Sequence, residues 1–386
     1  MKIAYVTPYK IDDSGVASGT VVSVKMALEE AGNEVLTVDN LSVPKCYSFI
    51  LKALKRLFHK EVNVLREPFV LKKITKEMER RLGELDFDIV FSQTSILCTY
   101  YKGEKPIVFY TDATFGGMIN YYWDTDIWFG FAVRHGNETE SLALKNCTKA
   151  IFASKWAVES AIKFHDASSS KCIAINRGAN IYHNYKFQEI KKYVEKRNII
   201  TKRGEICCLF VGRDWERKGG GLALEIVKKL CGRGIISKMV IVGCNPIISD
   251  DDKRYVEIIG FLNKEIREEN QKLQMLFLTS DFYLQPSKQE CQGIAYAEAS
   301  AFGLPVIATN TGGVSDIVTP SNGRLMCSEA NISDYADTIQ KFVAEPDEYR
   351  ALALCSFDFY MNTLNWKSVG QRLSGVLQQV MENRDE

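Results

Sequence analysis

Apolar and polar residues follow one another along this chain in blocks that predict strands alternating with helices. Up to about residue 180, short runs rich in β-branched and aromatic residues predict buried strands, and helical stretches such as Val21–Ala31 and Lys155–Phe164 lie between them. The predicted strands of this half are Ile3–Thr7, Glu34–Val38, Asp88–Phe91, Ile107–Tyr110, Ala150–Ala153 and Cys172–Asn176. Such an alternation predicts a parallel, doubly wound sheet.

A second series of strands and helices follows the charged segment Tyr185–Arg203, which we expect to be an exposed connector. Helices are expected over most of Ser333–Glu386. We therefore predict an α/β protein of two doubly wound, Rossmann-like domains facing across a cleft, with limits at 1–190 and 200–360 and a C-terminal helix at 361–386. The predicted strands of the second domain are Ile206–Val211, Lys238–Val242, Val256–Ile259, Asp281–Leu284 and Pro305–Ala308.

The composition is that of an ordinary globular chain and excludes several classes of function. The formal net charge of +1 gives no electrostatic reason to expect a nucleic-acid partner. The 11 cysteines form no Cys-x-x-Cys pair, which argues against a zinc site or a disulfide framework. There is no signal peptide and no apolar run long enough to cross a bilayer, so a cytoplasmic location is expected.

Two acids bracket the junction between a loop and a helix in the segment Asp281–Asp316. Glu290 lies in the loop after a short strand, and Glu298 lies inside a helix that is predicted to open near Gln292. Eight residues at helical rise span about 12 Å, roughly the distance from the sugar to the ribose of a nucleotide-diphosphate sugar. The helix start offers N–H groups to the diphosphate. A pair of surface acids is the alternative, but the neighbours of Glu298 are small or apolar.

Two cations follow the first strand of the second series, just before a glycine-rich helix start. Arg213 and Lys218 could form a clamp on a diphosphate and stabilise charge on a leaving nucleotide. A solvated turn between strand and helix is the alternative, and only the acids downstream favour the clamp.

These motifs, taken in order, carry a family resemblance that spans nearly the whole chain. The chain resembles the retaining glycosyltransferases of the GT-B fold (glycosyl transferases group 1), which include phosphatidylinositol mannosyltransferases, sucrose synthases and bacterial glycogen synthases. The matching motifs are Thr7-Pro8…Gly15…Gly19, Gly212-Arg213…Lys218-Gly219, Glu290…Gly293…Glu298-Ala299, Gly303-Leu304-Pro305-Val306 and Gly312-Gly313-Val314.

The resemblance implies metal-independent transfer of a sugar from a nucleotide-diphosphate sugar, UDP- or GDP-linked, to the hydroxyl of a glycan, glycolipid or small-molecule acceptor. No metal or cofactor is implied. The first domain would bind the acceptor, the second the donor, and the C-terminal helix would cross back onto the first domain. The implied catalytic residues are Asp112, Arg213, Lys218 and Glu290. The implied donor-binding residues are Gly15, Gly212, Arg213, Lys218, Gly260, Phe261, Leu262, Glu290, Cys291, Gln292, Gly293, Ile294 and Glu298. A non-catalytic nucleotide-sugar-binding protein and a nucleotide-sugar epimerase on the same fold are the alternatives.

This chain departs from the family pattern at two places. Thr111-Asp112 occupies the position where many relatives carry a histidine that contacts the transferred sugar. Asp112 could orient hydroxyl groups instead, or it could cap the next helix; His135 is a weaker substitute. Gln292 stands where the family usually has phenylalanine. The Gly15 loop could bring amides to the donor or acceptor, or it could be a plain helix start.

The segment Leu41–Lys60 contains five lysine or arginine residues, one histidine and no acidic residue. Apolar residues such as Phe49, Leu54 and Leu57 interleave with the cations at helical spacing. Residues 45–60 therefore predict a basic amphipathic helix, and two interpretations remain open. The helix could lie on an anionic membrane, which would suit a lipid-linked acceptor and a peripheral location at the inner face, or it could pack on the first domain with a solvated basic face.

Overall fold

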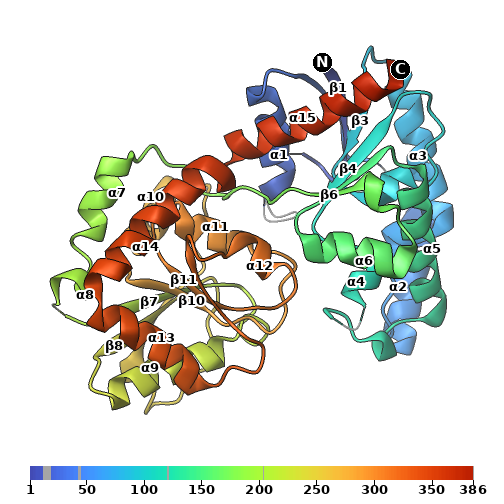
Figure 1. Ribbon diagram of the computed structural model, residues 1–386. Coiled ribbons are helices and arrows are strands. Elements are labelled where there is room, and N and C mark those ends of the chain that lie inside the picture. Colours follow the sequence, from blue (N-terminus) through green and yellow to red (C-terminus); the bar gives the residue numbers. More distant parts are fainter. Residues whose placement is uncertain (12–18, 42–44, 120, 203, 386) are drawn as a thin grey trace. The chain divides into compact units, whose positions relative to one another are not determined.

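The computed structural model describes residues 1–11, 19–41, 45–119, 121–202 and 204–385, and these residues form two compact units. The first unit comprises Met1–Arg177 together with Trp366–Glu386, and the second comprises Gly178–Asn365. Among the described residues, each unit contains a six-stranded parallel sheet with helices packed on it (Figure 1). The prediction of two doubly wound α/β domains is confirmed. Residues 178–190, which the sequence pattern assigns to the first domain, belong to the second unit.

The sheet of the first unit has the strand order β2-β1-β3-β4-β5-β6. Val6 at the end of β1 pairs with Val38 of β2 on one side and with Ser92 of β3 on the other. The carboxyl ends of these strands therefore lie along one edge, which is where this class of fold places ligands. The strands are β1 (Lys2–Val6), β2 (Glu34–Val38), β3 (Ile89–Ser92), β4 (Ile107–Thr111), β5 (Lys149–Phe152) and β6 (Cys172–Ala174).

Helices from both ends of the chain cover this sheet. The α-helices of the first unit are α1 (Thr20–Glu30), α2 (Lys45–Phe58), α3 (Pro68–Leu82), α4 (Phe115–Met118), α5 (Gly130–Asn146), α6 (Lys155–His165) and α15 (Trp366–Asp385), and short helices are η2 (Val64–Arg66), η3 (Ser95–Cys98), η4 (Thr125–Ile127) and η5 (Ser169–Lys171). Helix α15 packs closely on α1, because a Cβ at Gly370 would overlap the carbonyl oxygen of Ala27. Asn33 Nδ2 also donates to Ser374 Oγ at 3.0 Å.

The sheet of the second unit has the strand order β12-β11-β10-β7-β8-β9. Its strands are β7 (Ile206–Val211), β8 (Ser237–Val242), β9 (Val256–Gly260), β10 (Phe282–Gln285), β11 (Val306–Thr309) and β12 (Gly323–Met326). Strand β12 is missing from the sequence prediction because Gly-Arg-Leu-Met lacks the β-branched and aromatic residues that mark the other strands. The helices are α7 (Phe187–Val194), α8 (Asn198–Thr201), α9 (Gly220–Gly232), η6 (Lys253–Tyr255), α10 (Arg267–Thr279), α11 (Ile294–Ser300), α12 (Val314–Ile317), α13 (Ile332–Ala344), α14 (Pro346–Phe359) and the π-helix η7 (Tyr360–Leu364).

The expectation that Tyr185–Arg203 is an exposed connector is wrong. The segment contains helices α7 and α8, and Ile190 is fully buried. Between the two helices, Arg197 is only 2% exposed, and its guanidinium donates to the carbonyl oxygens of Phe302 (3.0 Å) and Gly303 (2.6 Å). The many charged residues suggested a solvated segment, but this arginine is fixed in the core by carbonyl groups that would otherwise lack a donor. No helix within the described ranges combines the length and apolar character that crossing a membrane requires.

His183 anchors the start of the second unit in an aromatic cluster. Its ring centroid lies 4.7 Å from that of Phe302 and 5.7 Å from that of Tyr360. Its Nδ1 accepts a hydrogen bond from the backbone N–H of Tyr185 at 3.2 Å, which requires an unprotonated Nδ1. Burial lowers the pKa of His183 to about 4.

We predict that the second unit loses stability as the pH falls from about 6.5 to about 4, because a lowered folded-state pKa means that the unfolded chain binds the extra proton in this window. The contribution is complete above pH 6.5 and reaches about 3 kcal/mol at most. Calorimetric melting of His183→Phe should show a smaller loss of Tm between pH 7 and pH 4.5 than the wild type. The exposed His59→Asn variant is the control and should keep the wild-type pH dependence; equal behaviour of the two variants would contradict the assignment.

Candidate active site

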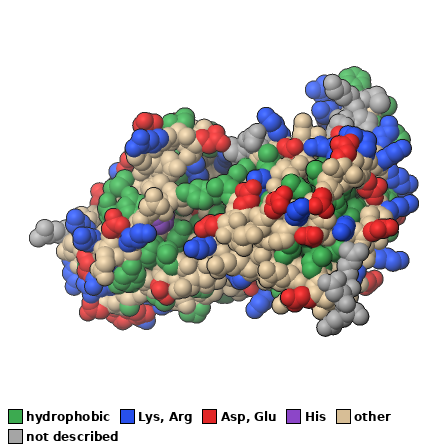
Figure 2. All heavy atoms as spheres, turned by 90° about the horizontal axis from the view of Figure 1, so that it is seen from above, with side chains coloured by type: hydrophobic (Ala, Val, Ile, Leu, Met, Phe, Trp, Pro, Cys, Tyr) green, Lys and Arg blue, Asp and Glu red, His purple; other side chains and the backbone are tan. Residues whose placement is uncertain are grey.

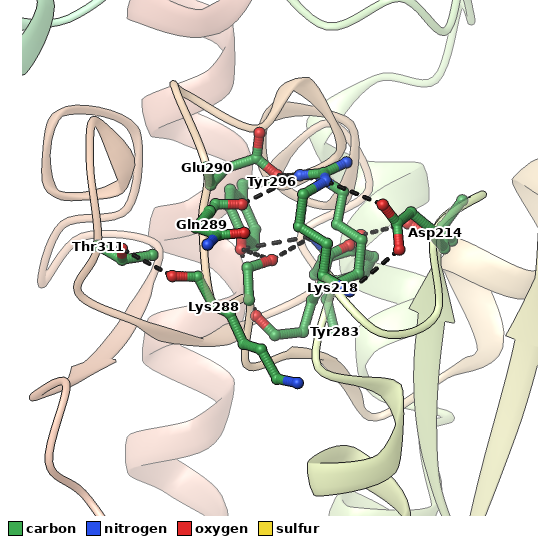
Figure 3. A network of polar contacts seen from close by, with 12 residues as sticks. Asp214, Lys218, Tyr283, Lys288, Gln289, Glu290, Tyr296 and Thr311 are labelled. Atoms are coloured by element: carbon green, nitrogen blue, oxygen red, sulfur yellow. Dashed lines mark hydrogen bonds and ion pairs between the residues drawn. The ribbon is translucent and has the colours of Figure 1, made fainter. Parts of the chain in front are cut away.

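A buried ion cluster joins the loops that follow two neighbouring strands of the second unit. The ammonium group of Lys218, from the loop after β7, contacts Oε2 of Glu290, from the loop after β10 (Figure 3). Arg217 Nη1 lies 3.7 Å from the same oxygen. The side chains of Lys218 and Glu290 are only 13% and 9% exposed. Because β7 and β10 pair directly, their carboxyl ends bring these two loops together, and the predicted residues Lys218 and Glu290 meet.

The loop that carries Glu290 is held from both sides. On one side, the backbone N–H of Lys288 donates to the carbonyl oxygen of Arg217 at 2.8 Å. On the other side, Thr311 Oγ1 donates to the carbonyl oxygen of Lys288 at 3.1 Å (Figure 3), and the N–H of Gly313 donates to that of Glu290 at 3.1 Å. The Gly312-Gly313-Val314 motif therefore has a structural role, which is to fix the position of the Glu290 backbone.

Arg217 is a member of the cluster that sequence reasoning missed. Its backbone N–H and its Nε donate to the two carboxylate oxygens of Asp214, at 3.0 and 3.2 Å. Its Nη1 donates to the carbonyl oxygen of Gln289 at 3.0 Å. The sequence alone does not indicate whether Arg217 or Lys218 points towards Glu290. In the structure, both side chains do. Arg213 instead lies with its guanidinium carbon 5.0 Å from the ring centroid of Phe261, so these two predicted donor-binding residues contact each other.

Glu298 is the most deeply buried acid of the predicted site. It lies in α11, is 1% exposed, and contacts the ammonium group of Lys264 from the loop after β9. Burial raises the pKa of the Tyr283 phenol well above its ordinary value, and the charges of Tyr296, Glu298 and Glu290 act in the same direction. The phenol therefore stays protonated, and its O–H donates to the carbonyl oxygen of Val211 at 3.1 Å. Sequence reasoning also missed Lys264.

The short loop between Glu290 and α11 is buried. The helix begins at Ile294, after Gly293 in a left-handed conformation (φ +82°), rather than near Gln292 as expected. Cys291 and Gln292 are 7% and 3% exposed. The side-chain nitrogen of Gln292 has no hydrogen-bond partner among the described residues, so it is a donor that a ligand could use.

The remaining predicted donor-binding residues of the second unit end adjacent strands. The N–H of Gly212, after β7, donates to the carbonyl oxygen of Val242 at 2.9 Å, and that of Gly243, after β8, donates to Gly260 at 2.8 Å. Gly260 has a φ of +79°, and Phe261 beyond it is 56% exposed while Leu262 is partly buried. The structure thus collects Gly212, Gly260, Glu290 and their neighbours at one edge of the sheet.

Asp112 lies in the first unit, directly after β4. It accepts a hydrogen bond from Arg177 Nη1 at 3.0 Å, and its side chain remains 47% exposed. The alternative that Asp112 caps the next helix is wrong, because Thr114 Oγ1 accepts the N–H of Gly117 at the start of α4. The Asp112 carboxylate is therefore oriented by an arginine and accessible to a ligand.

His135 does not lie in an open site of this kind. Its Nδ1 is 2.9 Å from Oε2 of the buried Glu67, and burial raises the pKa of that carboxyl group. The pair ties α5 to the start of α3. Gly15 lies outside the described residues.

Comparison with known structures places this fold in a class. The fold of the whole chain matches sucrose-phosphate synthase from Thermosynechococcus elongatus (TM-score 0.68, 16% identity, 99% of this chain and 100% of that one). It also matches HepE of Anabaena, solved with UDP and glucose (TM-score 0.63, 14% identity, 98% and 100%). The chain therefore has the GT-B fold of two Rossmann-like domains.

Similarity of sequence then identifies the family. Residues 192–353 match the model described as glycosyl transferases group 1. The chain is 24% identical over 324 residues to alpha-monoglucosyldiacylglycerol synthase of Acholeplasma laidlawii, covering 76% of each protein. It is 22% identical over 150 residues, 38% of each chain, to a GDP-mannose-dependent phosphatidylinositol dimannoside mannosyltransferase of Mycobacterium tuberculosis. Residues 192–353 therefore carry the domain of this family, and the chain is a retaining glycosyltransferase that uses a nucleotide-sugar donor.

Gly219 allows the loop after β7 to lie close to the loop after β10. Its φ is +75°, and a Cβ there would overlap the carbonyl oxygen of Pro286. We expect Gly219→Ala to displace Lys218 from Glu290 and to lower donor turnover about 100-fold, the effect of a misplacement of about 1 Å. Turnover is measured as release of nucleoside diphosphate. Gly221→Ala is the matched control, since a Cβ there meets nothing within 4 Å. Unchanged turnover in Gly219→Ala would show that the loop geometry is irrelevant to catalysis.

Proposed function

We propose that this chain binds a nucleoside diphosphate sugar at the carboxyl edge of the second unit's sheet and transfers the sugar to a hydroxyl group of a lipid-linked acceptor. The observation that carries the donor half is the buried cluster of Lys218, Arg217 and Glu290, with Glu298 nearby. Cations and acids rarely share a buried site unless they serve each other or a ligand that needs both. A sugar diphosphate is such a ligand, because its phosphates are anionic and its hydroxyl groups donate hydrogen bonds to carboxylates.

Lys218 and Glu290 of the cluster, together with neighbouring residues, have these roles in the proposal. As the bond between the sugar and the diphosphate breaks, negative charge develops on the departing phosphate. Lys218, whose side chain is largely buried, and the exposed Arg213 stabilise that charge through charge-assisted hydrogen bonds. Glu290 accepts hydrogen bonds from sugar hydroxyls, and Glu298 from the ribose. The spare amide of Gln292 supplies one more donor to the sugar.

The acceptor half of the proposal rests on the first unit. Asp112, oriented by Arg177, accepts the hydrogen bond of a hydroxyl group in place of the histidine that many relatives carry. The acceptor hydroxyl oxygen bonds to the anomeric carbon from the face on which the nucleoside diphosphate leaves, and its proton passes to the departing phosphate oxygen, so the configuration of the sugar is retained. One relative is named for the synthesis of a monoglucosyldiacylglycerol and another as a phosphatidylinositol dimannoside mannosyltransferase, and both names support a lipid-linked acceptor.

Helix α2 supports contact with an anionic membrane. Phe49 and Leu57, two turns apart, are 74% and 72% exposed, and Lys52 and Arg56 flank them. We call these four residues and Ala53 the α2 outer face, and they line a surface hollow of about 530 Å³. The inner side of the helix is held by Leu51, which is 3% exposed. Elsewhere cations and acids are interspersed, as on the face shown in Figure 2.

The exposed apolar side chains of the α2 outer face are unfavourable in water, but together with the neighbouring cations they are favourable at a membrane surface. Exposed aromatic and leucine side chains enter the boundary between head groups and acyl chains, while the cations remain at the level of anionic head groups. A protein that works on a lipid-linked hydroxyl gains from this arrangement, because its substrate is held in the same surface.

A screen with UDP-, GDP- and ADP-sugars tests the donor half. We expect one donor to release its nucleoside diphosphate, and we expect Lys218→Ala to lower release about 100-fold, the usual effect of removing one preorganised charge-stabilising group. Glu298→Ala should lower release about tenfold or more, because the ribose loses a hydrogen bond to a charged group. Lys253→Ala, at an exposed ion pair in η6, should match the wild type. Neither release nor binding of any donor would overturn the proposal.

Binding to lipid vesicles tests the membrane half. The protein should sediment with vesicles of phosphatidylglycerol and phosphatidylcholine, and less so at high salt, which screens the cations. The double variant Phe49→Ser, Leu57→Ser should weaken binding about tenfold or more, because two apolar side chains no longer insert. Ile247→Ser, which alters a fully exposed residue of the second unit, is the control. Equal binding to vesicles of phosphatidylcholine alone would contradict the electrostatic part.

A further inference from the structure

The pairing of Glu298 with Lys264 goes beyond the residues that the family pattern provides. Glu298 is 1% exposed, whereas the Lys264 side chain is 36% exposed, so a cation at the protein surface reaches inwards to a buried carboxylate. A buried charge without a partner is strongly unfavourable. Among the ion pairs of the described residues, Lys264 is the partner of Glu298.

Hydrogen bonds with α10 fix the backbone around Lys264 and so support its ion pair with Glu298. Asn270 Nδ2, from α10, donates to the carbonyl oxygen of Lys264 at 2.9 Å. One residue earlier, the N–H of Asn263 donates to Glu269 Oε2 at 2.6 Å. The first turn of α10 thus holds the loop in place, and the lysine side chain spans from this loop to α11.

We infer that Lys264 is a positioning residue that supplies the counter-charge for Glu298 and so sets the preference for ribonucleotide over deoxyribonucleotide donors. This inference rests on the proposed function, in which Glu298 accepts hydrogen bonds from the ribose. A carboxylate makes stronger hydrogen bonds with hydroxyl groups than a neutral acceptor does. The ribose hydroxyls form this hydrogen bond only if the carboxylate faces them, and the contact with the Lys264 ammonium group fixes that orientation.

A competing role for Lys264 would change the affinity for the nucleotide in the opposite direction. If Lys264 merely occupies the acceptor positions that the ribose needs, it competes with the nucleotide, and its removal strengthens binding. If it holds the carboxylate for the ribose, its removal weakens ribonucleotide binding and leaves a deoxyribonucleotide nearly unaffected. The ratio of the two affinities separates these cases, and it also separates positioning from a general loss of structure.

Calorimetric titration tests the inference. The wild type is titrated with UDP, GDP and ADP, and then with the 2′-deoxy form of the nucleotide that binds most tightly. We expect the wild type to prefer the ribose form about tenfold or more, which corresponds to one hydrogen bond to a charged group. Lys264→Met should reduce this preference to about threefold or less. Lys264→Arg should restore it, and the exposed Lys253→Met should leave it unchanged.

The outcomes are distinct. A wild-type preference that persists in Lys264→Met, or tighter ribonucleotide binding by that variant, overturns the inference while the proposed donor site stands. No preference in the wild type overturns the assignment of Glu298 to the ribose and the inference with it. No binding of any of the three nucleotides overturns the proposed function itself.

Discussion

A buried carboxylate requires a counter-charge, and Glu290 finds two on the loop of the neighbouring strand. Lys218 contacts it and Arg217 lies 3.7 Å away, so the loops after β7 and β10 are joined by charge as well as by sheet pairing. Breaking such a pair by removing one partner leaves an uncompensated charge, typically at a cost of about 3–5 kcal/mol. The surrounding turns follow from this constraint: Gly219 lets one loop approach Pro286, and Gly313 fixes the backbone of Glu290 from the other side.

The same arrangement explains how one edge of a sheet can serve a ligand of mixed character. Glycines follow β7 and β8 and end β9, where Gly212, Gly243 and Gly260 are joined by backbone hydrogen bonds to the neighbouring strands. In the proposed complex, cations meet the negative part of the ligand and the buried acids meet its hydroxyl groups. Water is largely absent around Glu298, so each of these interactions is stronger than it would be on an open surface.

Sequence reasoning predicted every described strand of the two sheets except β12, because apolar runs bounded by polar turns are a local signal that Gly-Arg-Leu-Met lacks. It also predicted that Lys218 and Glu290 belong to one site, since both follow strands that the fold places side by side. It could not find Lys264, because its importance comes from a contact with Glu298, 34 residues along the chain, that no local pattern records. The prediction for Tyr185–Arg203 was wrong for a related reason. Arg197 is charged, yet inside the core its guanidinium donates hydrogen bonds to carbonyl groups of residues distant in the sequence.

The central claim is that the charged cluster of the second unit binds the diphosphate and the ribose of a sugar nucleotide. A crystal structure of the protein with UDP or GDP tests it most directly. The account predicts the diphosphate within hydrogen-bond distance of Lys218, with the ribose hydroxyls on the carboxylate of Glu298. A nucleotide bound elsewhere, with the contacts of Lys218 to Glu290 and of Lys264 to Glu298 undisturbed, would contradict it.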